Sequence, residues 1–343
     1  MFAFKNDYSE GCHPQILEAL AAANLQKSAV YGEDEYCEKA RRCIQQLAGT
    51  AAGVHFFAGG TQTNLTFIGH ALRPYQAVIS AATGHIATHE TGAIEATGHK
   101  VIALPSAGGK LTVSLVAEAL QQHALAPHMV QPKMVYISHP TEVGTLYSPQ
   151  ELEELYRFCQ KKDLLLYLDG ARLASALAAQ PKELPLARLA ALTDAFYMGG
   201  TKCGALFGEA LVIVNPTLDA GFRYSIKQRG AMLAKGRLLG LQFYELLRGG
   251  LYLQLGQHAN QVAAALHSGL AAAGFSFLIE SPTNQQFPIF SAAAYQALEQ
   301  RYPGLSWDTT PEGKTAVRCV TSWATTMQEV EAFTAFCTGL AAV

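Results

Sequence analysis

The chain has 343 residues, of which 50% are hydrophobic and only 15% are charged, and its formal net charge is −2 at pH 7. At roughly 150 residues per domain this length predicts about two domains, and a nearly neutral chain is not typical of proteins that bind nucleic acid or anionic lipid. Average soluble domains carry about 25% charged residues, so part of this apolar surface is expected to be covered by another subunit or to lie in a membrane.

Short apolar runs alternate with longer stretches of helical spacing from about residue 54 to residue 214. This alternation is typical of parallel strands joined by crossover helices, and several runs are apolar throughout, as expected when helices cover both faces of a sheet. The pattern predicts a layered α/β domain. Its predicted strands are Val54–Phe57, Ala77–Ser80, Lys100–Leu104, Met134–Ser138, Leu164–Leu168, Ala195–Met198 and Leu211–Val214, and its predicted helices are Thr63–Leu72, Ile86–Thr97, Val113–His123, Pro149–Lys162 and Ala171–Ala179.

The pattern changes after Asn215, where two long helices are predicted on either side of Gly249 and Gly250. Shorter elements of both kinds follow, so we expect a compact α+β second domain. Residues 1–240 are predicted to form an N-terminal segment and a large domain, and residues 241–343 a small domain. The elements predicted in this part are helices Pro216–Arg248, Leu251–Ala273, Ala292–Arg301 and one that begins at Met327, and strands Phe275–Ile279, Gln286–Phe290 and Val317–Val320.

The sequence predicts neither a membrane segment nor a secretion signal. No uncharged apolar run approaches the roughly 20 residues that span a bilayer. Near the N-terminus, Lys5, Asp7 and Glu10 stand where a signal peptide needs an apolar core. The seven cysteines include no CxxC pair, so we expect them to be reduced and mostly buried. The protein is therefore expected in the cytoplasm.

A lysine flanked by glycines follows one of the predicted strands, in the segment Tyr197–Gly204. Burying a lysine is costly unless its charge is used or removed, and small neighbours leave room for a ligand to approach the amine of Lys202. Such an amine can form a Schiff base. The alternative is a solvated loop lysine, whereas the spacing excludes a Walker phosphate loop.

A carboxylate and an arginine follow the predicted strand Leu164–Leu168. Asp169 stands at the carboxyl end of this strand, where open α/β sheets bind ligands, and Arg172 lies three residues further on. A carboxylate in this place can bind a protonated ring nitrogen. The alternative is that Asp169 only caps the helix that follows.

Small residues and hydroxyls connect the first predicted strand to its helix, in the sequence AGGTQTN at 58–64. Backbone N–H groups exposed at such a helix start form a site for phosphate, here at Gly60 and Thr61. Capping of the helix by Thr61 or Thr63 is the competing interpretation, and the two can coexist.

Two histidines and a glutamate lie close together at 85–90. His85 and His89 have the four-residue spacing of a zinc helix, but the order is HxxxHE rather than HExxH, so metal binding is a weak interpretation. A histidine facing an aromatic ligand explains His85 better, with His89 an ordinary surface residue. Together with the lysine, the carboxylate and the phosphate site, this indicates pyridoxal 5'-phosphate (PLP) rather than a metal.

At this point the sequence resembles the low-specificity L-threonine aldolases of the β-eliminating lyase family, within the fold-type-I PLP enzymes. The resemblance covers nearly the whole chain in one order. Its motifs are FKNDYSEG at 4–11, VYGED at 30–34, AGGTQTN at 58–64, TGHIATHETGA at 83–93, HPTEVGT at 139–145, LDGARL at 168–173, GGTKCG at 199–204, KQRGAMLAKGR at 227–237 and VRCVTSW at 317–323.

The resemblance implies an aspartate-aminotransferase-like fold with a mostly parallel seven-stranded sheet. It also implies that Lys202 carries PLP as a Schiff base, that Asp169 binds the pyridine nitrogen, and that His85 stacks on the ring. Gly60 and Thr61 are expected to bind the phosphate.

Further roles concern the substrate. Arg172 is expected at the ring's phenolic oxygen or at the substrate carboxylate, and Arg318 at that carboxylate. Tyr31 is expected to reach a neighbouring subunit's site, and His128 to lie near the substrate hydroxyl, as a possible base acting directly or through water.

Two positions depart from the family's pattern. Asn6 stands where the family often has serine near the substrate carboxylate. Many relatives also have an arginine that reaches a neighbour's phosphate and aligns near Leu233. Here Lys227 is the cation expected in its place, with Arg229 and Lys235 as the alternatives. This variant motif is similar to that of phenylserine-active enzymes, so threonine need not be the preferred substrate.

The resemblance implies cleavage of L-3-hydroxy-α-amino acids (threonine, allo-threonine, phenylserine) to glycine and an aldehyde, by a homodimer or homotetramer with shared active sites and no metal. One alternative is a PLP-dependent lyase that releases pyruvate and ammonia. Another is a non-catalytic PLP-binding protein of the same fold. The most remote is a metallohydrolase that uses His85, His89 and Glu90.

Overall fold

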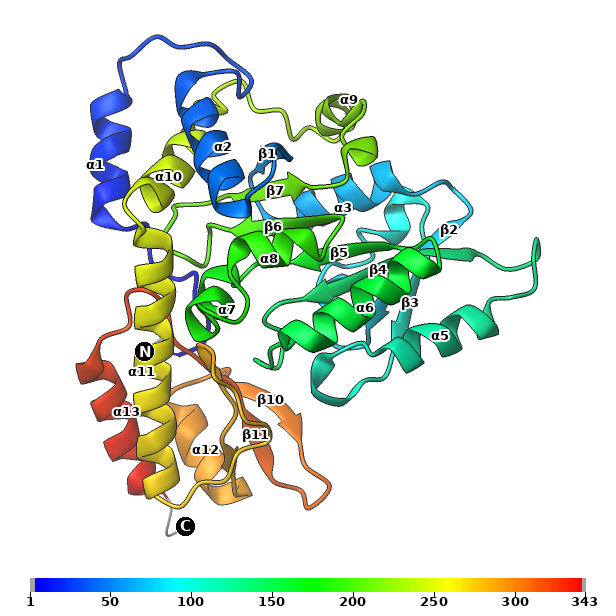
Figure 1. Cartoon of the computed structure of the whole chain (residues 1–343). Helices are drawn as coiled ribbons and strands as arrows, with labels where there is room; N and C mark the ends of the chain where they lie inside the picture. The colour runs from blue at the N-terminus through cyan, green and yellow to red at the C-terminus, as the bar shows by residue number, and fades with distance from the viewer. Residues whose placement is uncertain (1–3, 341–343) are drawn as a thin grey trace.

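A seven-stranded sheet forms the centre of the larger part of the molecule in a computed structural model, which describes residues 4–340 (Figure 1). The strand order is β1-β7-β6-β5-β4-β2-β3. Only β7 is antiparallel to its neighbours, so the other six strands run in one direction. The strands are β1 Gly53–Phe57, β2 Gln76–Ala81, β3 Val101–Leu104, β4 Gln131–Ser138, β5 Leu165–Asp169, β6 Ala195–Gly199 and β7 Glu209–Ile213. All seven strands predicted for this domain are confirmed.

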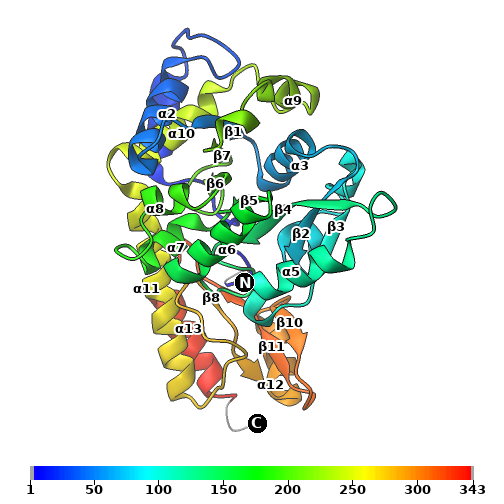
Figure 2. The ribbon, with the colours of Figure 1, turned by 45° about the vertical axis from the view of Figure 1, so that its right-hand side comes forward.

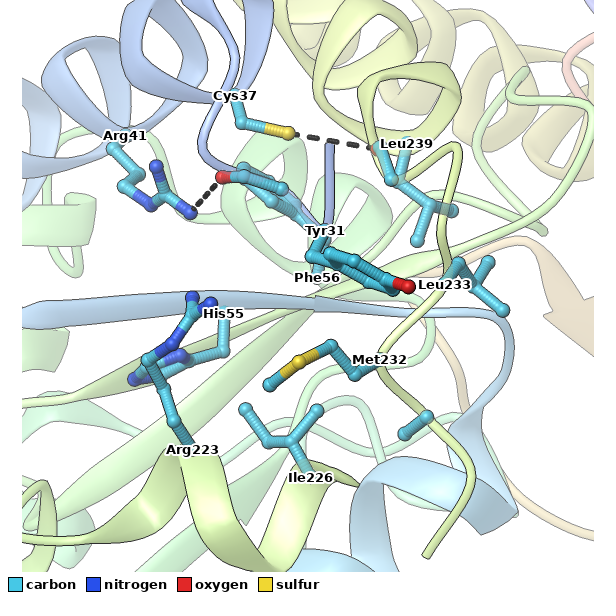
Figure 3. Close-up of a pocket in the computed structure, with 13 residues that line it drawn as sticks. Tyr31, Cys37, Arg41, His55, Phe56, Arg223, Ile226, Met232, Leu233 and Leu239 are labelled. Atoms are coloured by element: carbon cyan, nitrogen blue, oxygen red, sulfur yellow. Dashed lines mark hydrogen bonds between the residues drawn. The ribbon is translucent and has the colours of Figure 1, made fainter. Parts of the chain in front are cut away.

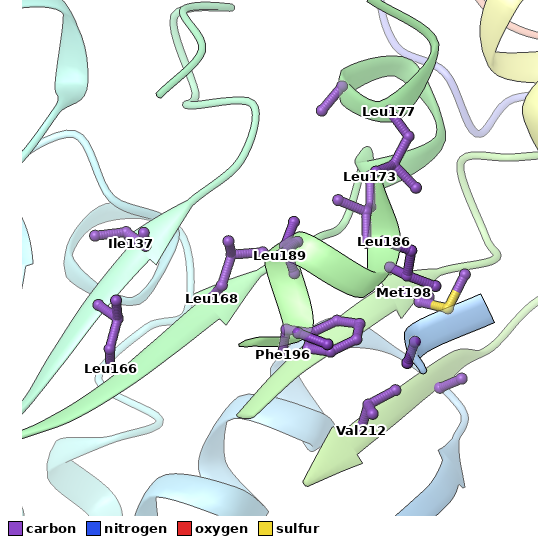
Figure 4. Packing of buried hydrophobic residues seen from close by; sticks show 14 of the residues in the cluster. Ile137, Leu166, Leu168, Leu173, Leu177, Leu186, Leu189, Phe196, Met198 and Val212 are labelled. Carbon is purple, nitrogen blue, oxygen red and sulfur yellow. The ribbon is translucent and has the colours of Figure 1, made fainter. Parts of the chain in front are cut away.

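Apolar side chains leave both faces of this sheet, because successive residues of a strand point in opposite directions. Leu166 and Leu168 face a large core shared with helices α2, α6, α7 and α8 (Figure 4). Tyr167, between them, faces a second core shared with α3 and α9. The sheet is therefore covered on both sides, as the apolar strands predicted.

Helices connect the strands and cover the sheet (Figures 1 and 2). The Asp34 carboxylate begins α2 by accepting hydrogen bonds from the N–H groups of Tyr36 and Cys37. Neither α1 nor α2 was predicted. The helices of this part are α1 Pro14–Ala23, α2 Glu35–Ala48, α3 Gly60–Ala71, α4 His85–Thr88, α5 Val113–Gln122, α6 Pro149–Lys161, α7 Leu173–Ala179, α8 Leu186–Ala191, α9 Phe222–Gln228 and α10 Arg237–Arg248.

Two of the predicted helices are wrong as single elements. The segment 86–97 turns after α4 at Thr91 and Gly92, which both have positive φ, and only the short 3-10 turn Glu95–Thr97 follows. The segment 216–248 divides into α9 and α10, because Gly230 with φ +69° redirects the chain after α9. In both cases a glycine supplies a backbone conformation that the apolar spacing did not reveal.

A smaller α+β part follows the long helix α11, which runs down from the large domain (Figure 1). Phe4 from the N-terminal segment packs into its core with Phe290 and Phe333. Its elements are α11 Leu251–Ala272, α12 Ala292–Arg301 and α13 Met327–Thr338, a three-stranded sheet of β10 Ser306–Thr309, β11 Thr315–Val317 and β9 Ile289–Phe290, and the pair β12 Cys319–Val320 and β8 Gln285–Gln286.

The small domain differs from the prediction in detail. The segment 275–279 forms only an isolated bridge between Phe277 and Pro288, and the expected strand 317–320 is interrupted at Arg318. Helix α10 packs against α1 and α2 of the large domain, whereas α11 packs against both α7 and α13. We therefore propose that the domain boundary lies within α11 rather than at residue 240.

None of the helices described for residues 4–340 is long and apolar enough to cross a membrane.

Candidate active site

A cavity of about 300 Å³ opens at the carboxyl ends of β5 and β6, beside the turn between β1 and α3. Ligands of open α/β sheets bind at this edge. The cavity brings together six of the residues predicted from the sequence. They are Gly60, Thr61, His85, Asp169, Arg172 and Lys202.

Lys202 lies in the loop that follows β6, which passes very close to the segment after β5. A Cβ atom on Gly199 would lie 2.1 Å from the Ala171 carbonyl oxygen, and one on Gly170 would lie 2.0 Å from the Tyr197 carbonyl oxygen. Only glycine therefore allows the two loops to approach. Burial and the nearby Arg172 guanidinium lower the pKa of the Lys202 amine, which favours its neutral, nucleophilic form.

Asp169 is the last residue of β5, and three donors fix its carboxylate. Oδ2 accepts hydrogen bonds from the Tyr136 hydroxyl at 2.5 Å and from Asn64 Nδ2 at 3.2 Å, while Oδ1 accepts from the Ala171 N–H at 3.0 Å. The side chain thus makes a local turn contact and also faces the cavity. Its position permits the predicted contact with a ring nitrogen.

The start of α3 borders the same cavity. Its N-cap residue Gly59 provides no side-chain cap, and the Thr63 hydroxyl donates to the Gly59 carbonyl oxygen at 3.0 Å instead of accepting from a helix N–H. The alternative that Thr61 or Thr63 caps the helix is therefore wrong. Uncapped N–H groups and the positive end of the helix dipole favour a phosphate here.

His85 is the first residue of α4, and its Nδ1 lies 2.8 Å from Glu90 Oε1. The buried Glu90 carboxylate also accepts a hydrogen bond from Asn64 Nδ2 at 2.8 Å. Because Asn64 contacts Asp169 as well, a hydrogen-bonded chain connects His85 to Asp169. The described residues hold no group of three or more His, Cys, Asp or Glu side chains arranged for a metal ion.

Arg172 forms a bidentate ion pair with Asp7 from the N-terminal segment. The distances are 2.7 Å from Nε to Oδ2 and 3.1 Å from Nη2 to Oδ1, and Asn284 Nδ2 donates to Oδ2 at 2.9 Å. Burial alone would raise the pKa of Asp7, but the charge of Arg172, with Lys202 and these hydrogen bonds, holds it below its usual value. Nη1 of Arg172 has no partner among the described residues, which leaves it available to a ligand.

Arg318 lies between β11 and β12, with its guanidinium 4.7 Å from the centre of the Trp307 ring. Among residues 4–340 no carboxylate lies within 4.0 Å of it. Burial lowers the pKa of Arg318, and the positive charge of the Arg172 guanidinium lowers it further. A pair of this kind is suited to binding a carboxylate.

Five predicted site residues are not among those that line the cavity, namely Asn6, Tyr31, His128, Lys227 and Arg318. Asn6 Oδ1 accepts hydrogen bonds from the Tyr8 N–H and the Ser9 hydroxyl, so its side chain stabilises a turn, while Tyr8 lines the cavity. His128 is exposed in the loop before β4 and therefore lies at the amino end of this strand. Asp169 lies beside the carboxyl end of the same strand, where it pairs with Ser138. At about 3.3 Å per residue, this eight-residue strand separates His128 from its own chain's cavity. His128 therefore does not line its own chain's cavity, and its expected place near a substrate hydroxyl stays a prediction.

Tyr31 and Lys227 also lie outside the cavity, and both are exposed. Lys227 Nζ is 4.9 Å from the centre of the Tyr31 ring, and the two residues line a surface hollow with Arg223, Tyr224 and Met232. Tyr31 also lines a small inner cavity of about 40 Å³, together with Arg223 and Met232 (Figure 3). Their predicted role at a neighbouring subunit's site stays a prediction.

Several residues at the site were given no role in a PLP site from the sequence, although Glu90 was named in the metallohydrolase alternative. Asp7, Glu90 and Glu142 stand within the motifs quoted above, so their positions were visible, but their contacts depend on the fold. Asn64, which stands in the motif AGGTQTN, and Glu209, which stands in none of the quoted motifs, were also missed. Glu209 accepts hydrogen bonds from the Thr201 hydroxyl and the Gly200 N–H, and burial raises its pKa.

Replacement of Asp7 tests the buried ion pair. We expect Asp7→Ala to lower the unfolding free energy at pH 7 by about 3–5 kcal/mol, because Arg172 is left buried without its partner. The pKa of Asp7 is lowered in the folded protein, so this stabilisation is complete above its unfolded pKa of about 3.9 and is lost as the pH falls further. Urea unfolding at several pH values measures it, with the exposed Asp308→Ala as control. An equal loss for both variants would contradict the pairing.

Comparison with known sequences connects this site to a family. The sequence matches the family described as Beta-eliminating lyase over residues 6–335. It is 33% identical over 305 residues to a low specificity L-threonine aldolase of Pseudomonas sp. (strain NCIMB 10558), covering 87% of each chain. To that of Pseudomonas aeruginosa it is 32% identical over 335 residues, which cover 95% of this chain and 94% of the relative.

Solved structures agree with the sequence comparison. The structure is similar to that of a threonine aldolase of Leishmania major, with a TM-score of 0.96 and 47% identity over 99% of this chain and 100% of the other. A Thermus thermophilus aspartate aminotransferase variant matches with a TM-score of 0.71 at 16% identity, over 99% of this chain and 91% of the other, and shows the fold alone. The predicted fold-type-I, aspartate-aminotransferase-like architecture is confirmed. The chain belongs to the β-eliminating lyase family.

Proposed function

We propose that the protein is a PLP-dependent aldolase that cleaves L-3-hydroxy-α-amino acids to glycine and an aldehyde. The observation that carries this proposal is the cavity in which Lys202, Asp169, His85 and the start of α3 meet. Relatives that cover 87% and 95% of the chain are named low specificity L-threonine aldolases, which supports the same reaction class.

The residues of the cavity fit PLP group by group. Lys202 offers an amine of lowered pKa to the aldehyde, and the Asp169 carboxylate is placed for the ring nitrogen. His85 would lie against the ring, and Gly60 and Thr61 would bind the phosphate at the uncapped helix start. When bound, PLP supplies an electron sink for the pair that remains on Cα when a bond to Cα breaks.

The surrounding residues would hold the amino acid. Arg318 has no carboxylate partner among the described residues, and Arg172 retains a free Nη1, so both are available to the substrate carboxylate. Fixing that carboxylate restrains Cα, which limits the orientation of the Cα–Cβ bond. Cleavage also requires a group that takes the β-hydroxyl proton, and His128 of the same chain does not line this cavity.

A substrate panel tests the proposed reaction class. Threonine, allo-threonine, serine and phenylserine are incubated with the protein loaded with PLP, and the products are identified. We expect glycine and an aldehyde from threonine, allo-threonine and phenylserine. Formation of pyruvate and ammonia would instead indicate a β-eliminating lyase, and no turnover of any compound would favour a non-catalytic protein.

The protein is further proposed to form a homodimer or homotetramer in the cytoplasm. Large exposed side chains support this assembly, among them Tyr224, which is 84% exposed beside Tyr31 and Lys227. Covering this surface would account for the low charged fraction of the sequence. The seven cysteines are free thiols, as expected in a reducing compartment.

Subunit mixing tests whether active sites are shared. We expect Tyr31→Ala to lose most activity as a homo-oligomer. Mixed oligomers of this variant with Lys202→Ala should regain part of the activity, because the Lys202 site of one subunit receives Tyr31 from the other. No recovery after denaturation and joint refolding, or a monomer on sizing, would contradict shared sites.

A further inference from the structure

Four acidic or imidazole groups line the cavity, and in two of them, Asp169 and Glu209, both carboxylate oxygens are hydrogen-bonded. Asp169 accepts from three donors, and both oxygens of Glu209 are hydrogen-bonded. His85 is held by Glu90 and is placed against the expected ring. Glu142 is different, since only one of its oxygens is occupied.

Oε1 of Glu142 accepts hydrogen bonds from the Ser138 hydroxyl at 2.6 Å and from the His85 N–H at 2.9 Å. Oε2 has no hydrogen-bond partner among the described residues. It is also not one of the fully buried polar atoms that lack a partner in this part of the chain. The residue is only 8% exposed and lines the cavity. A well-anchored carboxylate therefore presents one free oxygen to the space where a ligand binds.

Glu142 and Arg172, one of the two arginines expected to bind the substrate carboxylate, line the same cavity. The negative charge of Glu142 contributes to the raised pKa of Arg172 and opposes the lowering of the pKa of Arg318 by burial. Burial, together with the negative charge of Asp169, raises the pKa of Glu142, and the Ser138 and His85 hydrogen bonds oppose this rise. A carboxyl group with a raised pKa is a stronger base than an exposed one.

We infer that Glu142 is the base that takes the β-hydroxyl proton of the substrate, an inference that rests on the proposed aldolase function. The O–H proton moves to Oε2, the freed electron pair forms the C=O bond of the aldehyde, and the Cα–Cβ pair remains on Cα. Cα then receives a proton to give glycine, which restores the proton balance. In the reverse reaction Glu142 donates this proton to the new hydroxyl.

Glu142→Gln separates this role from a structural one. The amide oxygen can accept the same two hydrogen bonds, but the amide cannot take a proton. We expect kcat for cleavage to fall by about 10²–10⁴-fold. Exchange of the α-proton of glycine in D₂O needs no hydroxyl base, so its rate, followed by NMR, should stay at that of the unchanged protein. Loss of both reactions, or of neither, would overturn the inference.

Ser138→Ala gives a second, independent test. This variant keeps the carboxylate but removes a hydrogen bond that lowers the pKa of Glu142. The acidic limb of the pH profile of kcat/KM should therefore move to higher pH, and an unmoved limb would contradict the assignment.

The outcomes distinguish the two proposals. If the unchanged protein makes no glycine and aldehyde, the proposed aldolase function fails together with the role of Glu142. If the unchanged protein makes them and Glu142→Gln cleaves at full rate, only the role of Glu142 fails.

Discussion

Lys202→Ala is expected to abolish both the bound chromophore and the formation of glycine. The amine of Lys202 is the only lysine amine that lines the described cavity, and its lowered pKa favours covalent attachment. Without it we expect kcat to fall by on the order of 10³-fold or more. The purified variant should also lose the visible absorbance that PLP gives when it is bound to a lysine.

Lys110→Ala is a matched control for this experiment. Lys110 pairs with Glu151 at 2.6 Å, outside the cavity. Borohydride reduction followed by mass spectrometry should locate the cofactor on the peptide that contains Lys202. Cofactor on another peptide, or full cleavage activity in Lys202→Ala, would contradict the assignment.

Asp169→Asn is expected to have the second largest effect. A carboxylate next to the ring nitrogen stabilises its protonated form, and a neutral amide does not. Removing one such preorganised charge lowers kcat by on the order of 10²–10³-fold. Absorbance of the bound cofactor should remain, because Lys202 is unchanged. The measurement is therefore kcat together with the spectrum of the variant.

Tyr136→Phe is the corresponding control. It removes one donor to Asp169 but leaves the carboxylate, so we expect a clearly smaller loss of kcat than in Asp169→Asn. Equal losses in the two variants would show that the charge of Asp169 is not what matters. Thermal unfolding of both variants checks that the loss of kcat does not result from a loss of stability when the buried hydrogen bonds of Asp169 are changed.

The sequence predicts the large domain well because its signals are local. Apolar runs mark the seven strands, and residues at the carboxyl ends of parallel strands meet at one edge of the sheet. For this reason Asp169 and Lys202, which lie far apart in the chain, could be assigned to one site. Glycines that permit tight approach, such as Gly199, were visible as part of the same motif.

Other features depend on contacts that no local pattern contains. The ion pair between Asp7 and Arg172 joins residues that are 165 positions apart. Oε2 of Glu142 is free because the Ser138 hydroxyl donates to the other oxygen, Oε1. His128 shows the opposite case: a residue aligned with a family position lies at the far edge of its own sheet. Sequence spacing alone does not tell which edge a loop occupies.

Product stoichiometry from a single β-hydroxy amino acid tests the central claim most directly. The protein loaded with PLP is incubated with L-threonine or L-allo-threonine, and glycine, acetaldehyde, pyruvate and ammonia are measured in the same sample. The structure predicts glycine and acetaldehyde in equal amounts, without ammonia or an oxo acid. Release of ammonia with an oxo acid, and no glycine, would contradict the aldolase proposal.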